Sequence, residues 1–254
     1  MIEIQLFGNA RHHDRVHGVG RAGYGGRKPQ QVLWLLALNG DRTLPKARLA
    51  EQLWEGEPPA SWLSTLEGYV SLLRRALRGG PDQCPAVVTS PGGYRLDLDR
   101  VAVDVCRFDA LVAAAGATAD TAADCLRQAL GLAIGPVLDG EVERSWILDA
   151  RTRYEERVCA AATAAARFAL DAGDLTASIG YGKWACELDP FAEDAWHTVI
   201  AGQWRSGRRA QALRSFEQVQ TLLDTHLRVR PNRALQELYL DVLRDELAPA
   251  LLAG

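Results

Sequence analysis

A single apolar stripe runs along residues 62–77 at the spacing of an amphipathic helix. The opposite face carries small and basic residues, so we expect one side of this helix to pack and the other to bind a partner. A solvated face, with its arginines placed near the C-terminal end by the helix dipole, is the alternative interpretation. The stripe consists of Trp62, Leu66, Tyr69, Val70, Leu73 and Leu77, and the opposite face of Ser64, Gly68, Ser71 and Arg75, with Thr65, Leu72 and Arg74 alongside.

The patterns around this helix predict a small domain. Residues 2–7 alternate like a half-buried strand, and a polar, glycine-rich loop follows them. Helices are expected at 27–39 and 46–54, and a hairpin is expected from 87 to 98 around Pro91-Gly92-Gly93. This order is typical of a winged helix-turn-helix, in which the third helix enters the DNA major groove and the hairpin contacts the adjacent backbone or minor groove.

The pattern of the second half of the chain predicts a series of alanine-rich helices. Gly173 and Gly207 lie 34 residues apart, and each closes one expected helix before another opens. Small or apolar residues follow each glycine at the same offsets, a period that is typical of tetratricopeptide repeats, with a plain helical bundle as the alternative. Helices are expected at 107–115, 121–133, 145–172, 175–188, 192–206, 209–227 and 234–247.

Charge divides the chain at about the same place as these patterns. The first 102 residues carry a net charge of +3 and the rest carry −6, which suits a front half that meets a polyanion. We therefore predict two domains, a winged helix-turn-helix at 1–100 and an all-α, tetratricopeptide-like domain at 103–254. The predicted fold class is mostly α with small β elements.

Several other classes of protein fit the sequence poorly. The longest apolar run is 32–38 and no signal peptide is recognisable, so we expect a cytoplasmic protein with no membrane partner. The five cysteines are odd in number and widely spaced, which favours reduced thiols over disulfides or a zinc site.

Two motifs suggest cofactors, but only weakly. Gly18, Gly20 and Gly23 form a GxGxxG that lacks the strand before it and the helix after it that a dinucleotide site needs. His12, His13 and His17 have no cysteine or second carboxylate cluster to complete a metal site, and a polar loop between strand and helix explains them better. We expect no cofactor, no metal, no catalytic residue and no enzymatic activity.

Four stretches, in this order, resemble the Streptomyces antibiotic regulatory protein family. They are GGRK at 25–28, STLEGYVSLLRRAL at 64–77, PGGYRL at 91–96 and VDVCRFDALV at 103–112. The resemblance covers residues 2–247 and is to the short members, which lack the ATPase and sensor domains of larger relatives. It implies an OmpR-type winged helix followed by a bacterial transcriptional activation domain.

The same resemblance implies what the chain does. Such a protein is a transcriptional activator that binds direct repeats of double-stranded promoter DNA near the −35 region, as a dimer on DNA. It recruits RNA polymerase holoenzyme through the sigma factor and other subunits, and we expect its target to be a secondary-metabolite, or antibiotic biosynthesis, gene cluster.

The resemblance also implies roles for individual residues. Phosphate contacts fall on Arg27, Lys28, Lys46 and Thr65, the major groove faces Ser71, Leu72, Arg74 and Arg75 beside Ser64 and Gly68, and Arg95 approaches the minor groove or its backbone. The loop 55–61 between the second and third helices is where related domains meet polymerase, through Glu55, Glu57, Ser61 and Trp62.

One departure from the family pattern keeps a rival function open. Related helices often carry arginine where this chain has Ser71 and Leu72, and Glu67 adds an acid that either accepts a hydrogen bond from cytosine or repels phosphate. The rival is a protein-interaction scaffold whose winged-helix domain binds DNA weakly or not at all.

Overall fold

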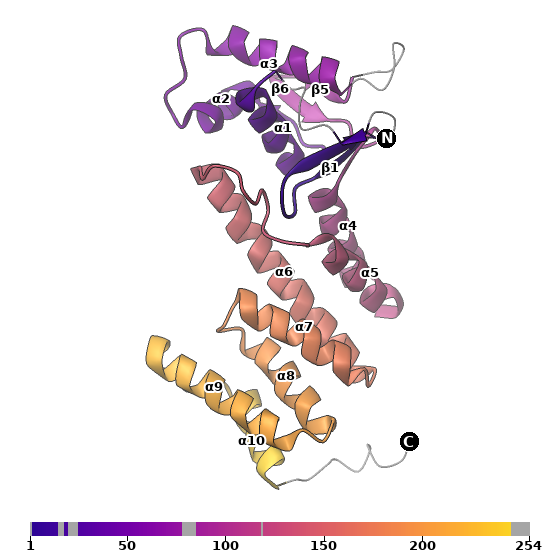
Figure 1. Cartoon of the computed structure of the whole chain (residues 1–254), viewed down its shortest axis with the longest axis vertical. Coiled ribbons are helices and arrows are strands. Elements are labelled where there is room, and N and C mark those ends of the chain that lie inside the picture. The colour runs from indigo at the N-terminus through magenta and orange to yellow at the C-terminus, as the bar shows by residue number, and fades with distance from the viewer. Residues whose placement is uncertain (1, 15–17, 20–24, 78–84, 118, 245–254) are drawn as a thin grey trace. The chain divides into compact units, whose positions relative to one another are not determined.

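The computed structural model of the chain describes residues 2–14, 18–19, 25–77, 85–117 and 119–244 (Figure 1). Two compact units are present. The first comprises residues 1–111 and 131–154, and the second comprises 112–130 and 155–254. No helix within the described ranges is long and apolar enough to cross a membrane.

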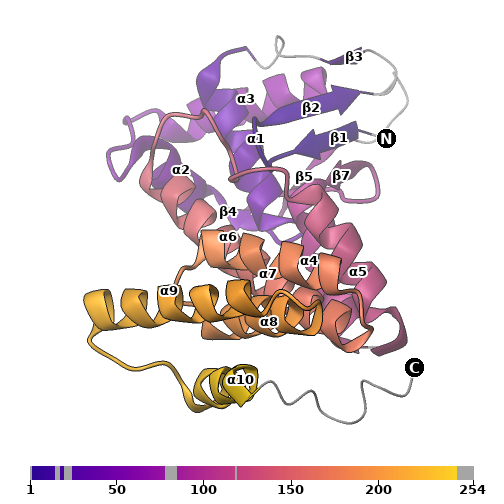
Figure 2. The same ribbon diagram turned by 60° about the horizontal axis from the view of Figure 1, so that its bottom comes forward.

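A four-stranded sheet begins the first unit, in the order β3-β2-β1-β7. The predicted first strand is present as β1 (Ile2–Gln5), with Ile2 and Ile4 buried. The glycine-rich loop predicted after it was wrong in part, because β2 (Arg11–Asp14) and β3 (Gly18–Val19) lie there, and β2 pairs antiparallel with β1 (Figure 2). Sequence alternation gave no sign of β2, since RHHD is polar throughout and becomes a strand by pairing with a neighbour.

The last strand of this sheet, β7 (Val101–Val103), was also missed. It runs parallel to β1, with Ile2 opposite Val101. Three residues are too few for a periodic signal, so only the distant partner strand defines it.

Three helices follow within the bounds that the sequence predicted. They are α1 (Arg27–Asn39), α2 (Lys46–Trp54) and α3 (Trp62–Ala76). Helix α1 is buried from Gln31 to Ala37 and forms the centre of the core. The apolar stripe of α3 packs as expected, with Leu66, Val70 and Leu73 fully buried.

The predicted hairpin is the wing of the domain. Strands β5 (Val87–Ser90) and β6 (Gly93–Leu96) pair antiparallel, and β4 (Leu44–Pro45) pairs with the other edge of β6. The turn between β5 and β6 contains Gly92 at φ +77°, a conformation that glycine adopts without strain. A hydrogen bond from the Lys46 N–H to the Gly92 carbonyl, 3.0 Å long, joins this turn to the start of α2.

A later segment, residues 131–154, packs into the same unit. Isolated bridges join Phe7 to Val137 and Asn9 to Asp139. The ring of Tyr154 meets that of Phe7 edge-on, with centroids 5.6 Å apart. Local composition placed the domain boundary near residue 103 and could not show that residues 131–154 pack back into the first unit. These contacts join residues more than a hundred positions apart.

Each of the next three helices has residues in both units. They are α4 (Asp104–Ala117), α5 (Ala119–Leu132) and α6 (Ser145–Asp171). The carboxylate of Asp104 accepts hydrogen bonds from the backbone N–H groups of Leu6 and Phe7, each 2.9 Å long. The start of α4 is thereby fixed to the end of β1.

The described part of the second unit is entirely helical, as predicted. Its last four helices are α7 (Leu175–Leu188), α8 (Glu193–Arg205), α9 (Arg209–Leu227) and α10 (Arg233–Arg244). Gly173 and Gly207 both have φ near +80° and both end a helix. The residue after each donates a hydrogen bond to the carbonyl five positions back, from Asp174 to Ala169 and from Arg208 to Gln203. The 34-residue period is therefore a repeat of backbone geometry.

Candidate nucleic-acid interface

The free face of α3 consists of small residues and one arginine. Ser64, Gly68, Ser71 and Arg75 are all exposed, on the side of the helix opposite its buried leucines. A Cβ built on Gly68 meets no atom within 4 Å. Within the described part of the chain, Arg75 has no hydrogen-bond or ion-pair partner, so its guanidinium is available to an external acceptor.

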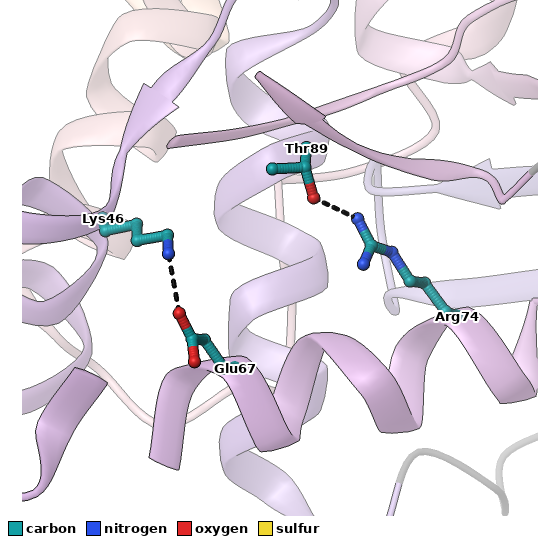
Figure 3. A network of polar contacts seen from close by, with 4 residues as sticks. All are labelled: Lys46, Glu67, Arg74 and Thr89. Carbon is teal, nitrogen blue, oxygen red and sulfur yellow. Dashed lines mark hydrogen bonds and ion pairs between the residues drawn. The ribbon is translucent and has the colours of Figure 1, made fainter. Parts of the chain in front are cut away.

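Lys46 is already paired. Its ammonium group donates a 2.7 Å hydrogen bond to the carboxylate of Glu67, across the gap between α2 and α3 (Figure 3). The same ammonium lies 5.4 Å from the ring centre of Tyr94 in the wing. The hydrogen bond that Lys46 donates to Glu67 is the main cause that raises the pKa of Lys46. Both side chains are partly exposed, so a phosphate that approaches Lys46 competes with Glu67 for the same ammonium.

Arg74 points into the wing. Its Nε donates to the Val87 carbonyl at 2.9 Å, and its terminal Nη2 donates to the hydroxyl of Thr89 at 2.6 Å (Figure 3). Its guanidinium also lies 6.0 Å from the ring centre of Tyr94. Arg74 and its neighbour Arg75 thus differ in availability, because the first joins α3 to the hairpin and the second is exposed.

The two basic residues at the start of α1 also differ in their availability to a phosphate. Arg27 is exposed in the first turn. Lys28 instead donates a hydrogen bond to the Leu53 carbonyl at the end of α2 and lies 5.6 Å from the ring centre of Trp54. Burial is the main cause that lowers the pKa of Lys28. A phosphate contact by Lys28 therefore requires it to leave the end of α2.

Two further predicted contacts are half-buried. A Cβ on Gly25 would lie 2.8 Å from a methyl group of Leu72, so Leu72 lies against the segment before α1. Arg95 donates to the Leu96 carbonyl at 3.2 Å. The major-groove position predicted for Leu72 and the approach of Arg95 to the minor groove or its backbone remain predictions.

The N-terminal end of α3 carries three hydroxyl groups. Ser64 donates to the Ser61 carbonyl at 3.0 Å, and the Thr65 hydroxyl lies 3.5 Å from that of Ser61. Ser61 and Ser64 are exposed and Thr65 is half-buried. The backbone N–H groups at this end of a helix favour a phosphate nearby.

The loop between α2 and α3 is held at its first residue. Glu55 adopts the left-handed conformation with φ +55°, and its carboxylate pairs with Arg144 at 2.8 Å. Glu57 is exposed, whereas Trp62 is half-buried. No local sequence signal indicated Arg144, because it belongs to the segment that returns from beyond α5.

Comparison with known proteins places these features in a family. Residues 103–243 match the family described as "Bacterial transcriptional activator domain", and residues 20–96 match "Transcriptional regulatory protein, C terminal". The chain is 32% identical to Regulatory protein DnrI of Streptomyces peucetius over 229 residues, which is 86% of this chain and 84% of DnrI. It is 28% identical to Transcriptional regulator RedD of Streptomyces coelicolor, over 96% of this chain and 71% of RedD.

A solved structure matches nearly the whole chain. It is described as "Mycobacterium tuberculosis EmbR in complex with low affinity phosphopeptide", with a TM-score of 0.82 and 28% identity over 99% of this chain and 67% of that one. In the sequence comparison with Transcriptional regulatory protein EmbR, at 30% identity, the matched region is 58% of EmbR.

A winged helix-turn-helix joined to a helical activation domain defines a transcriptional regulator of the activator type. The chain belongs to the Streptomyces antibiotic regulatory protein family, as the four sequence stretches indicated.

Proposed function

We propose that the chain activates transcription by placing the exposed face of α3 in the major groove of promoter DNA. The observation that carries this proposal is the exposed stripe formed by Ser64, Gly68, Ser71 and Arg75, in which every residue except Arg75 is small. A helix with such a face approaches base edges closely, and Arg75 at its end bonds guanine or phosphate. The wing, joined to α3 by Arg74, then lies along the neighbouring backbone.

Affinity for a single site is expected to be modest. Arg74 is held by the wing and Lys46 by Glu67, so few cations are free for phosphate before binding. Two copies on direct repeats near the −35 region compensate for this, together with contacts to RNA polymerase. We propose the loop that begins at Glu55 as the polymerase contact, with Glu57 as its exposed acid, and a secondary-metabolite gene cluster as the target.

DNA binding is tested by fluorescence anisotropy. The full chain is titrated onto DNA from upstream of its neighbouring genes and onto shuffled DNA, at several salt concentrations. We expect a preference for the upstream DNA, with log affinity falling by about 0.9 per phosphate contact against log salt. Arg75→Ala should weaken binding by about 1–3 kcal/mol if Arg75 reads a guanine.

The matched control is Arg107→Ala, which removes an exposed arginine from α4 in the same unit. It should leave DNA affinity unchanged. Equal, weak binding of the wild-type chain to both DNAs would favour the scaffold instead.

Polymerase recruitment is tested by transcription in vitro from the same upstream DNA. Glu57→Ala should lower transcript yield while DNA affinity stays unchanged. Glu51→Ala, which removes an exposed acid from α2, is the control and should alter neither. Equal yields from all three proteins would exclude Glu57 as a polymerase contact.

A further inference from the structure

A cavity of about 730 Å³ lies in the second unit, along helices α7, α8 and α9. Each helix contributes one stripe of residues at helical spacing. Lys183 and Glu187 come from α7, and Trp196, Val199 and Gln203 come from α8. Helix α9 contributes Gln211, Arg214, Gln218 and Leu222.

The floor of this groove contains a buried amide with a spare donor. Gln203 is only 4% exposed, and its Oε1 accepts a 2.9 Å hydrogen bond from the hydroxyl of Ser215, another lining residue. The Nε2 group of Gln203 has no hydrogen-bond partner among the described residues. It is nevertheless open to solvent in the groove. A buried amide whose donor group reaches a groove donates there to water or to an acceptor of an occupant.

The wall beside this amide is rigid and partly apolar. Trp196 is buried, and its Nε1 donates a 2.9 Å hydrogen bond to the Pro190 carbonyl, which fixes the indole ring. Val199 is buried beside it, and Leu222 faces it from α9. Because Trp196 is 7% exposed and Leu222 is half-buried, these two side chains offer an occupant a small apolar surface.

The rim offers amides and cations. Gln211 and Gln218 are exposed, and no side-chain bond of either is formed within the described chain. Lys183 on one wall and Arg214 on the other are exposed cations, whereas Glu187 is the single acid that lines the groove. The groove thus has a positive balance and three amides that each donate and accept hydrogen bonds.

We propose that this groove binds an extended, acidic peptide segment of a partner protein. An extended backbone has unpaired N–H and C=O groups, and the amides of Gln203, Gln211 and Gln218 match both. A helical occupant has already paired those groups within itself and gains less from amides. The carboxylates of the segment pair with Lys183 and Arg214, and one of its apolar side chains lies on Trp196.

The test needs no knowledge of the partner and no DNA, so its result is independent of the proposed DNA binding. Two synthetic pools of pentapeptides are passed over the immobilised full chain, and the retained members are identified by mass spectrometry. In one pool positions two and four are aspartate, in the other they are asparagine, and the remaining positions are random. We expect retention from the aspartate pool and not from the asparagine pool.

Retained peptides are resynthesised with a fluorescent label for anisotropy. Gln218→Ala should weaken their binding about 3- to 10-fold, the range for loss of one hydrogen bond. Gln220→Ala, two residues along α9 and outside the groove, should leave binding unchanged. N-methylation of the peptide backbone should also weaken binding. Equal retention of the two pools, no retention from either, or equal effects of Gln218→Ala and Gln220→Ala would overturn the proposal.

Discussion

Helices α7 and α3 both contain glycine, but for different reasons. In α7, a Cβ on Gly182 would lie 2.6 Å from the hydroxyl of Thr198 and 2.8 Å from a methyl of Val199, so close packing against α8 requires glycine. In α3, the space around Gly68 is open. Glycine inside a helix is destabilising by roughly 0.5–1 kcal/mol relative to alanine. The fold explains Gly182 and gives no packing reason for Gly68.

The largest expected effect is on the packed glycine. Gly182→Ala should lower the free energy of unfolding by about 1–3 kcal/mol, because the new methyl overpacks α7 against α8. Gly180→Ala, in the same helix with no atom within 4 Å of its added Cβ, should raise it by about 0.5–1 kcal/mol. Denaturant unfolding monitored by circular dichroism measures both. If both substitutions changed the free energy of unfolding in the same direction, the difference between the packed Gly182 and the open Gly180 would be contradicted.

The two neighbouring arginines extend the comparison within α3. Arg74→Ala should lower the free energy of unfolding by about 0.5–1.5 kcal/mol per lost hydrogen bond, because the bonds to Val87 and Thr89 disappear. Arg75→Ala should leave stability unchanged, since Arg75 is exposed. Thermal and denaturant unfolding of the two variants provide the measurement. A stability loss at Arg75 as large as that at Arg74 would show that Arg75 also serves the fold.

Gly68→Ala should separate stability from binding. We expect the free energy of unfolding to rise by about 0.5–1 kcal/mol, because alanine is the better helix former. DNA affinity should fall, because the methyl group holds α3 away from the bases. Gly180→Ala, which also fills open space in a helix, should raise stability and leave DNA affinity unchanged. Unchanged DNA affinity in Gly68→Ala would mean that Gly68 does not contact DNA.

The smallest expected effect concerns the ion pair between Lys46 and Glu67. Glu67→Ala releases the ammonium group of Lys46, and an exposed ion pair contributes only about 0–1 kcal/mol to stability. Affinity for promoter DNA should rise, and the slope of log affinity against log salt should steepen by about 0.9, which corresponds to one more phosphate contact. Weaker binding of this variant would instead indicate that Glu67 accepts a hydrogen bond from a base.

The elements predicted well were those specified by nearby residues. The bounds of α1 and α2 agree with prediction at both ends, because the apolar periods and the stops at Gly40 and after Trp54 are local. Strand β2 was missed because RHHD has no apolar alternation, although its partner β1 lies close by in the sequence. The segment 131–154 was missed because its partners lie more than a hundred residues away.

The candidate site shows the same limit. Helical spacing alone predicted which residues of α3 are exposed. It did not predict that Arg74 is held by the wing or that Lys46 is held by Glu67, since each contact joins different elements. Local patterns thus indicate which face is free, and tertiary contacts decide which of its cations are available.

The most direct test of the central claim is to map where α3 lies on DNA. Ser71→Cys is labelled with a DNA-cleaving iron chelate, and the unsubstituted chain, labelled identically, corrects for the five native cysteines. The account predicts additional cuts that are confined to a few base pairs within each direct repeat. Cuts spread evenly along the fragment, or none beyond those of the unsubstituted chain while the protein is bound, would contradict it.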